Sequence, residues 1–271
     1  MKSLTKKTRR LGQLIIALAL ALIMVTGTMA GPAPLAFIEV LKDGDIGHGE
    51  DPVDGLHGAY SVIVSPDNKH VYAAGVFDDA IAVFSRDAGT GKLTFVEVHK
   101  DNVAPVDGLD GAQSVTVSPD NKHVYAAGLL DDAIAVFSRD AGTGKLSFVE
   151  MLKDGVGGVD GLDGAYSVIV SPDNQHVYAT GSTDDAIAVF SRNASTGALT
   201  FVEMLQDGVG GVDGLNNAKG VTVSSDSQHV YAAGRSDNAI AVFGQAIVPT
   251  VLFGTNTIPA NGANLATGPT Q

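Results

Sequence analysis

The sequence contains no cysteine and no tryptophan, and aromatic residues make up only 6% of its 271 positions. Without cysteine the chain cannot form disulfides, thiolate zinc sites, a thiol nucleophile or a lipid anchor on a cysteine. With so few aromatic side chains, its core has to be built from valine, alanine, isoleucine and leucine. The hydrophobic content of 45% is enough for one or two ordinary domains.

Basic residues are also scarce, since 17 lysines and arginines stand against 30 aspartates and glutamates, giving a formal net charge of −13. Five of the basic residues lie within the first ten positions, so the remainder of the chain is more acidic still. Such a surface repels the phosphates of nucleic acids and anionic lipid headgroups. We therefore expect no nucleic-acid partner and no membrane contact beyond the N-terminal segment. Cation binding and simple solubility both fit the charge.

The two ends of the chain differ from its middle. Residues 1–30 have the pattern of a signal peptide, because a basic start precedes the apolar run 14–25 and small residues before Ala30. That run is short for a membrane-spanning helix, which needs ~20 residues, although an uncleaved anchor is the alternative. We expect an exported protein, whether periplasmic, secreted or on the cell surface. Residues 246–271 contain Pro249 and Pro259 and are predicted to be a linker or the start of a truncated further module.

The middle of the chain is one unit repeated with a period of 53 residues. Its anchor, Val-Asp-Gly-Leu, begins at Val53, Val106, Val159 and Val212, and the first two copies differ at only 11 of 53 positions. A repeat this regular determines the architecture. It also limits what the sequence reveals about function, because catalytic sites usually need residues that occur once.

Each repeat contains four short apolar runs separated by turn residues. In the second copy they cover residues 114–118, 123–127, 133–138 and 146–151, and a hairpin turn, Ala141–Lys145, precedes the last. Four antiparallel strands in 40–50 residues are typical of a β-propeller blade. The sequence therefore predicts an all-β fold, a propeller of four four-stranded blades over residues 35–245. A solenoid or a sandwich is the alternative.

The last copy has three runs and lacks the fourth. Residues 35–43, before the first full copy, match residues 93–101, the fourth run of that copy. We therefore expect strand 35–42 to complete the last blade and close the ring, which removes two exposed edges. An eight-blade ring of two chains and a fragment of a longer propeller are the alternatives.

Two phrases, Ser65–Gly75 and Asp78–Glu97, resemble the lactonase-like β-propeller family, which includes propeller-type 6-phosphogluconolactonases and extracytoplasmic repeat proteins of the YVTN-like kind. The resemblance covers residues 35–245. It implies the blade fold and, as a possible activity, hydrolysis of a sugar lactone. The lactonases of that family have seven blades, whereas this chain encodes four.

Two sets of acidic residues are candidate metal ligands. The loop before each first strand carries one aspartate, and four carboxylates around one axis would form an oxygen-rich ring that suits Ca²⁺ or Mg²⁺. The members of this set are Asp54, Asp107, Asp160 and Asp213. The alternative is that each caps a turn. The second set, Asp43, Asp45 and Glu50, lies in an unrepeated loop that could hold Ca²⁺ or simply be exposed. No other cofactor is expected.

One position that differs between the copies is a candidate binding face. Directly before the innermost strand the copies carry Tyr60, Gln113, Tyr166 and Lys219. Varied residues on a constant frame are typical of a binding surface, although drift between duplicated copies explains them as well. The repeated histidines, His70 and its equivalents, lie on the second strand of each blade, so we expect them to be structural.

Near-identical blades offer little of the asymmetry that catalysis requires. We therefore expect a binding or scaffolding module, whose partner is a protein or a small-molecule or carbohydrate ligand. The alternative is a lactonase that opens a sugar lactone by attack of water, which needs a general base and oxyanion stabilisers in one pocket.

Overall fold

The computed structural model describes residues 35–46 and 51–244, which form fifteen strands and no helix. The chain divides into two units, Met1–Glu39 and Val40–Gln271, and every strand belongs to the second. Within the described ranges there is accordingly no helical segment able to cross a membrane. The expected signal peptide and the C-terminal tail lie outside the described residues.

The first repeat folds into a four-stranded antiparallel sheet in which each strand pairs with the next. Its strands are β1 (Ala59–Val64), β2 (His70–Gly75), β3 (Ala80–Arg86) and β4 (Leu93–Lys100). The tight turn between β1 and β2 has Asn68 at a φ of 61°, a left-handed conformation that asparagine tolerates better than most residues. The four-run prediction for one repeat is thus confirmed.

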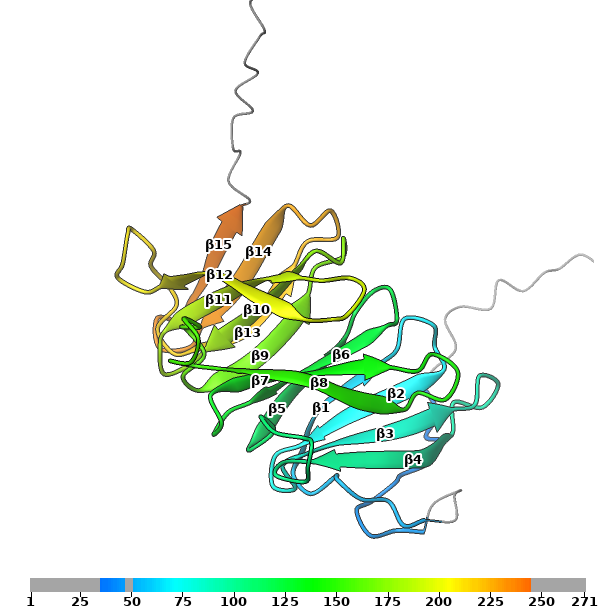
Figure 1. The fold of residues 1–271 in the computed structure, drawn as a ribbon. Coiled ribbons are helices and arrows are strands. Elements are labelled where there is room, and N and C mark those ends of the chain that lie inside the picture. Colours follow the sequence, from blue (N-terminus) through cyan, green and yellow to red (C-terminus); the bar gives the residue numbers. More distant parts are fainter. Residues whose placement is uncertain (1–34, 47–50, 245–271) are drawn as a thin grey trace, which may run out of the picture. The chain divides into compact units, whose positions relative to one another are not determined.

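The other repeats form the same sheet in sequence order, and we call the sheets blades 1 to 4 (Figure 1). Blade 2 contains β5 (Ala112–Val117), β6 (His123–Gly128), β7 (Ala133–Arg139) and β8 (Leu146–Lys153), and blade 3 contains β9 (Ala165–Val170), β10 (His176–Gly181), β11 (Ala186–Arg192) and β12 (Leu199–Gln206). Blade 4 contains β13 (Ala218–Val223), β14 (His229–Gly234) and β15 (Ala239–Gly244).

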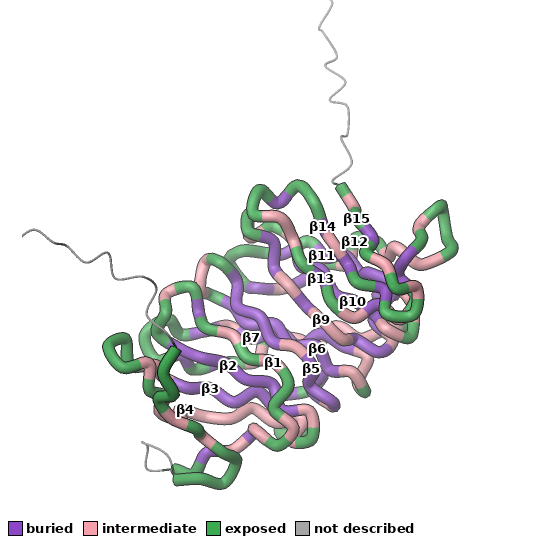
Figure 2. Tube along the Cα trace, turned by 180° about the vertical axis from the view of Figure 1, so that it is seen from behind, coloured by how far each residue is buried: buried purple, intermediate pink, exposed green. Residues whose placement is uncertain are grey.

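The core lies between neighbouring blades, where the first strand of one blade packs on the middle strands of the blade before it. Between blades 1 and 2, Tyr72, Ile81 and Val83 pack against Val115 and Phe137 in one buried cluster. The middle strands β2, β3, β6 and β7 are therefore apolar on both faces, and they are the most buried parts of Figure 2.

Glycine is required where loops approach the sheet edge most closely. A Cβ on Gly75 would lie 2.4 Å from the carbonyl oxygen of Gly55, which is backbone and cannot move aside. Gly55 itself has a φ of 89°. This contact explains why the Asp-Gly-Leu anchor and the glycine that ends the second strand recur together in every copy.

The expected ring closure is wrong for the described residues. Residues 35–42 form no strand, and blade 4 remains a three-stranded sheet with β15 at its edge. Extensive contacts join only consecutive blades, so the first and last sheets do not come together. The sequence match correctly identified a segment with the composition of a fourth strand. It carried no information on whether β15 of the same chain comes within its reach.

Candidate functional site

The four varied residues share a structural peculiarity that the repeat itself conceals. Each is the extra residue of a β-bulge at the start of its first strand, so it has no partner in the register of the neighbouring strand. The bulged residues are Tyr60, Gln113, Tyr166 and Lys219. Bulges redirect side chains and are frequent beside active sites. The fold therefore presents one non-repeated side chain from each blade in a special orientation.

Three of these side chains meet although they come from three different blades. The hydroxyl groups of Tyr60 and Tyr166 are hydrogen-bonded across blade 2, and their rings pack edge to face with centroids 6.0 Å apart. The ammonium nitrogen of Lys219 lies 3.9 Å from the centroid of the Tyr166 ring, a cation–π contact. The structure thus brings together residues separated by 106 and 53 positions in the sequence.

The environment changes the acidity of this cluster. Burial raises the pKa of Tyr166 to about 12, and the hydrogen bond with Tyr60 contributes to the rise, so the phenol stays protonated near neutral pH. Burial lowers the pKa of Lys219, and the positive charge of Arg235 lowers it further. The charge of Arg235 thus acts on both Tyr166 and Lys219.

Gln113, the bulged residue of blade 2, has an unsatisfied polar atom. The residue is only 8% exposed, and its Oε1 is buried and accepts no hydrogen bond within the part of the chain that the structure describes. Buried polar atoms without a partner are costly and rare in native proteins. The unsatisfied acceptor on the bulge of blade 2 leaves a position for a hydrogen-bond donor.

The contacts join two phenol hydroxyls and an ammonium group, on which the charge of the Arg235 guanidinium acts, and the bulge of the blade between the two tyrosines carries the amide of Gln113. All of these donate hydrogen bonds, and two are positively charged in an otherwise acidic protein. This set fits a small anion rich in hydroxyl and carbonyl oxygens. It fits a nucleic acid poorly, because the net charge of the chain opposes one.

Sequence reasoning found the four bulged residues but missed Arg235. This arginine lies in the loop between the second and third strands of blade 4, where the other copies carry apolar or hydroxyl residues, Val76, Leu129 and Ser182. That difference between the copies was a usable signal. Its effect on Lys219 could not be predicted from the sequence, because Lys219 lies on β13 whereas Arg235 lies in the loop after β14.

The four aspartates of the first candidate metal set do not come together in one site within the described residues. Each lies in its own acidic triad beside the loop that leads into its blade, and within a triad the oxygens all lie within 4.8 Å of one another. The triads are Asp43, Asp54 and Asp78; Asp101, Asp107 and Asp131; Asp154, Asp160 and Asp184; and Asp207, Asp213 and Asp237. The period correctly indicated equivalent positions, but the neighbours of each aspartate come from adjoining loops.

Most triad carboxylates already accept hydrogen bonds from backbone N–H groups. Asp101 accepts one from Leu109 and Asp131 accepts one from Asp110, each at 3.0 Å, and the other junctions repeat this pattern. Lys100 also forms a 2.8 Å ion pair with Asp54. These bonds explain the triads as turn-stabilising groups. Binding of Ca²⁺ or Mg²⁺ there stays a prediction.

The second candidate metal set is not assembled in the described residues. Asp43 belongs to the first triad, where it accepts the N–H of Leu56, whereas the carboxylate of Asp45 accepts the N–H of Lys42. Glu50 lies outside the described residues. A cation site from these three residues stays a prediction.

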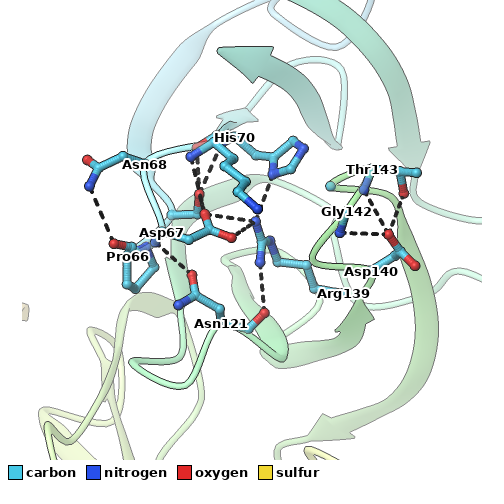
Figure 3. A network of polar contacts seen from close by, with 12 residues as sticks. Pro66, Asp67, Asn68, His70, Asn121, Arg139, Asp140, Gly142 and Thr143 are labelled. Atoms are coloured by element: carbon cyan, nitrogen blue, oxygen red, sulfur yellow. Dashed lines mark hydrogen bonds and ion pairs between the residues drawn. The ribbon is translucent and has the colours of Figure 1, made fainter. Parts of the chain in front are cut away.

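Two of the four repeated histidines, His70 and His123, belong to buried contacts between blades, and Figure 3 shows the contact of His70. Arg139 of blade 2 reaches into blade 1, where its Nη2 lies 2.7 Å from His70 Nδ1 and 3.1 Å from Asp67 Oδ2, while its Nε donates to the Tyr72 hydroxyl at 2.6 Å. The arginine side chain is fully buried. Burial lowers the pKa of His70, and the arginine charge lowers it further, so the imidazole is neutral and accepts from the guanidinium.

We call this contact the arginine lock. Blades 2 and 3 repeat it with Arg192 against Asp120, His123 and Tyr125 at nearly the same distances. The structural role expected for these histidines is confirmed at both junctions.

Comparison with known proteins identifies one family. The family described as "Lactonase, 7-bladed beta-propeller" matches residues 45–150 and 163–250. Two 6-phosphogluconolactonases are similar to the chain: that of Klebsiella pneumoniae strain 342 is 27% identical over 203 residues, and that of Pectobacterium carotovorum is 23% identical over 201 residues. These alignments cover 75% and 74% of this chain but only 58% and 57% of the relatives, so the chain spans little more than half of their length.

Among solved structures, the periplasmic gluconolactonase of Pseudomonas aeruginosa has a similar fold, with a TM-score of 0.56 at 21% identity. The match covers 69% of this chain and 50% of that protein. The described part of this chain contains four sheets, fewer than the seven blades in the family description.

These relatives correct the expectation of a non-catalytic binding or scaffolding module and favour the lactonase alternative. That expectation rested on the near-identity of the blades. It underestimated the asymmetry that a few residues create, because the bulges bring the residues that differ into one cluster.

Proposed function

The chain belongs to the seven-bladed lactonase β-propeller family, and we propose that it hydrolyses a sugar lactone at the cluster formed by Tyr60, Gln113, Tyr166, Lys219 and Arg235. The observation that carries this proposal is that hydrogen-bond donors at a position that varies between the copies come into contact although they belong to separate blades. The same bulge position of blade 2 carries Gln113, whose buried acceptor is unsatisfied. We further propose that the protein acts after export.

Hydrolysis of a lactone begins when water attacks the carbonyl carbon and the carbonyl oxygen becomes negatively charged. Collapse of this intermediate breaks the bond to the ring oxygen. One proton of the attacking water ends on that oxygen, which becomes a hydroxyl group, and the other passes to solvent, which leaves a carboxylate. In the Tyr60–Tyr166 pair one phenol O–H is not used in the bond between the two rings, and it can donate a hydrogen bond to the oxyanion. Donors placed at such an oxygen contribute ~10²–10³-fold to kcat.

Lys219 and Arg235 are suited to the anionic part of the substrate. A phosphate or carboxylate is held by charge-assisted hydrogen bonds, which are stronger than neutral ones. Two cations therefore favour 6-phosphogluconolactone over the unphosphorylated lactone. The described cluster contains no carboxylate and no histidine, so its proposed contributions are substrate binding and oxyanion stabilisation.

The test is a pH-stat assay of the purified chain with 6-phosphogluconolactone and with glucono-1,5-lactone, each corrected for spontaneous hydrolysis. We expect Lys219→Met to raise KM for the phosphorylated lactone by roughly 10–100-fold, as loss of one charge-assisted contact implies. We expect the Tyr60→Phe, Tyr166→Phe double variant to lower kcat by about 10²-fold.

The matched control is Lys122→Met, which removes an exposed lysine from the turn between β5 and β6 of blade 2. It should leave both constants unchanged. A wild-type rate equal to the spontaneous rate on both lactones would refute the proposed function. Equal effects of Lys219→Met and Lys122→Met would instead remove the cluster from the site.

A further inference from the structure

The side of blade 1 that faces away from blade 2 leaves apolar residues uncovered. On the first strands of blades 2 and 3, the equivalent valines are almost fully buried by the preceding blade; Val115, for example, is 4% exposed. In blade 1 the same positions, Val62 and Val64, are 70% and 44% exposed. This face lacks the neighbour that every later blade has.

Blade 4 leaves the opposite side uncovered. In blade 1, Ile81 and Val83 are completely buried because blade 2 packs on them. Their equivalents on β15, Ile240 and Val242, are 71% and 59% exposed. The same face carries a hollow of 280 Å³ lined by Thr222, Tyr231 and Ile240, among others. The described blades thus end in two large apolar surfaces.

These two surfaces are the two halves of one interface that the chain already forms. The exposed side of blade 4 has the same residues that blade 1 uses to pack on blade 2. The exposed side of blade 1 has the same residues that blade 2 uses to pack on blade 1. Contact between the surfaces would therefore repeat, side chain for side chain, a packing that is buried elsewhere in the molecule.

The residues of an arginine lock are likewise divided between the two exposed surfaces, with the acceptors on blade 4 and the arginine on blade 1. Blade 4 presents Asp226, His229 and Tyr231 at the positions of Asp67, His70 and Tyr72. In the described part of the chain no ion pair reaches Asp226, and its carboxylate accepts only local bonds, from Ser224 and from the N–H of Gln228.

Blade 1 presents the missing partner. Arg86 ends β3 as Arg139 ends β7, and its Nη1 donates to Asn68 of its own blade as Nη1 of Arg139 donates to Asn121. Arg86 lacks an acidic residue of a preceding blade in the described residues, whereas Arg139 has Asp67. The guanidinium and its acceptors thus stand at opposite ends of the blade series.

We propose that two copies of this chain associate head to tail, with blade 4 of each copy bound to blade 1 of the other. Arg86 of one copy then enters the lock formed by Asp226, His229 and Tyr231 of the second copy. Two such contacts close an eight-blade ring, which lies within the range of known propellers. Head-to-tail contacts of this kind give a closed ring when the rotation between copies is completed.

The same association supplies the strand that blade 4 lacks. Asp43 accepts the N–H of Leu56, just as Asp101, directly after the fourth strand of blade 1, accepts the N–H of Leu109. The segment that precedes blade 1 is thus connected to it in the same way as the fourth strand of blade 1 is connected to blade 2. Residues 35–42, which have the sequence of a fourth strand, then pair with β15 of the other copy. Donation of a strand to an exposed sheet edge is an established mode of association.

Sedimentation velocity with complementary charge reversals tests this arrangement. We expect the wild-type chain to sediment as a dimer. Arg86→Asp places two carboxylates in each lock and Asp226→Arg places two guanidinium groups there, so each variant alone should weaken association by on the order of 100-fold and sediment as a monomer. Lys122→Asp, with the same change of charge on an exposed turn, should remain a dimer.

Mixing the two variants separates this arrangement from closure within one chain. In the mixed dimer both locks again contain one arginine and one aspartate, so an equimolar mixture should regain the dimer mass. A monomeric wild type, dimeric single variants, or a mixture that stays monomeric would each overturn the proposal. Polymers that grow with concentration would overturn the closed ring. Circular dichroism of each variant verifies that it is folded.

Discussion

The two ends of the strands use the same repeat in opposite ways. At the end that contains the turn between the first and second strands, the arginine lock recurs with the same residues and nearly the same distances, as the contacts of Arg139 and Arg192 show. At the opposite end, where the first strand begins, the bulged position carries tyrosine, glutamine, tyrosine and lysine in turn. The repeat is uniform where it joins blades and varied where side chains from several blades meet.

This difference teaches where to look for function in a nearly identical repeat. A residue that holds two blades together has the same task at every junction, so its copies can remain the same. A residue that contacts an asymmetric ligand has a different task in each blade. The separation predicts that the two ends can be damaged independently, one through stability and the other through ligand binding.

The largest expected effect comes from breaking a lock. Arg139→Ala removes a fully buried guanidinium and leaves the Nδ1 of the buried His70 without its donor, while the part-buried Asp67 loses its ion pair. An unsatisfied buried acceptor costs about 1–3 kcal/mol, and the lost packing of the arginine side chain adds to this cost. Thermal unfolding should show a large decrease in Tm. Lys122→Ala is the matched control. A decrease no larger than that of the control would mean that the lock contributes nothing to stability.

The sequence predicted those parts of the fold that depend on residues close together in the chain. The 53-residue period and the runs of Val, Ile and Ala predicted the strands, and the turn residues predicted their ends. The partner of His70 was not predictable, because Arg139 lies 69 positions away and the histidine alone gives no sign of it. Ring closure was predicted wrongly, because similarity to a fourth strand identifies what a segment can pair with but not whether the partner edge is within reach.

The residues of the candidate site could be selected from the sequence, but their contacts could not. Comparison of the copies selected Tyr60, Gln113, Tyr166 and Lys219, because this position varies between them. It could not show that each one is a bulge, nor that Tyr60 contacts Tyr166 across an intervening blade, because both facts depend on register and on the packing of sheets. For Asp107 and its equivalents, the period suggested a ring around one axis, whereas loop packing places each in its own triad.

A smaller effect is expected from completing the third lock. Position 245, which lies outside the described residues, carries glutamine where the earlier copies carry arginine, and the Nδ1 of His176 is buried without a hydrogen bond in the described part of the chain. Gln245→Arg should supply the missing donor. A hydrogen bond to a charged group contributes about 1.5–3 kcal/mol, so urea unfolding should show a higher midpoint.

The control for this variant is Gln245→Lys, which adds the charge without the planar fork that the lock uses. If the lysine variant gains as much stability as the arginine variant, the effect is one of net charge. If neither variant gains, the blade 3 and blade 4 junction does not follow the geometry of the other two.

The central claim is that specificity resides in the residues where the copies differ. Isothermal titration calorimetry with 6-phosphogluconate, the product expected from the proposed reaction, tests it most directly. We predict binding to the wild-type chain, a loss of at least about tenfold in affinity for Lys219→Met, and no loss for Lys122→Met, with equal Tm values for both variants. Undiminished binding by Lys219→Met, or no binding by the wild-type chain, would contradict the account.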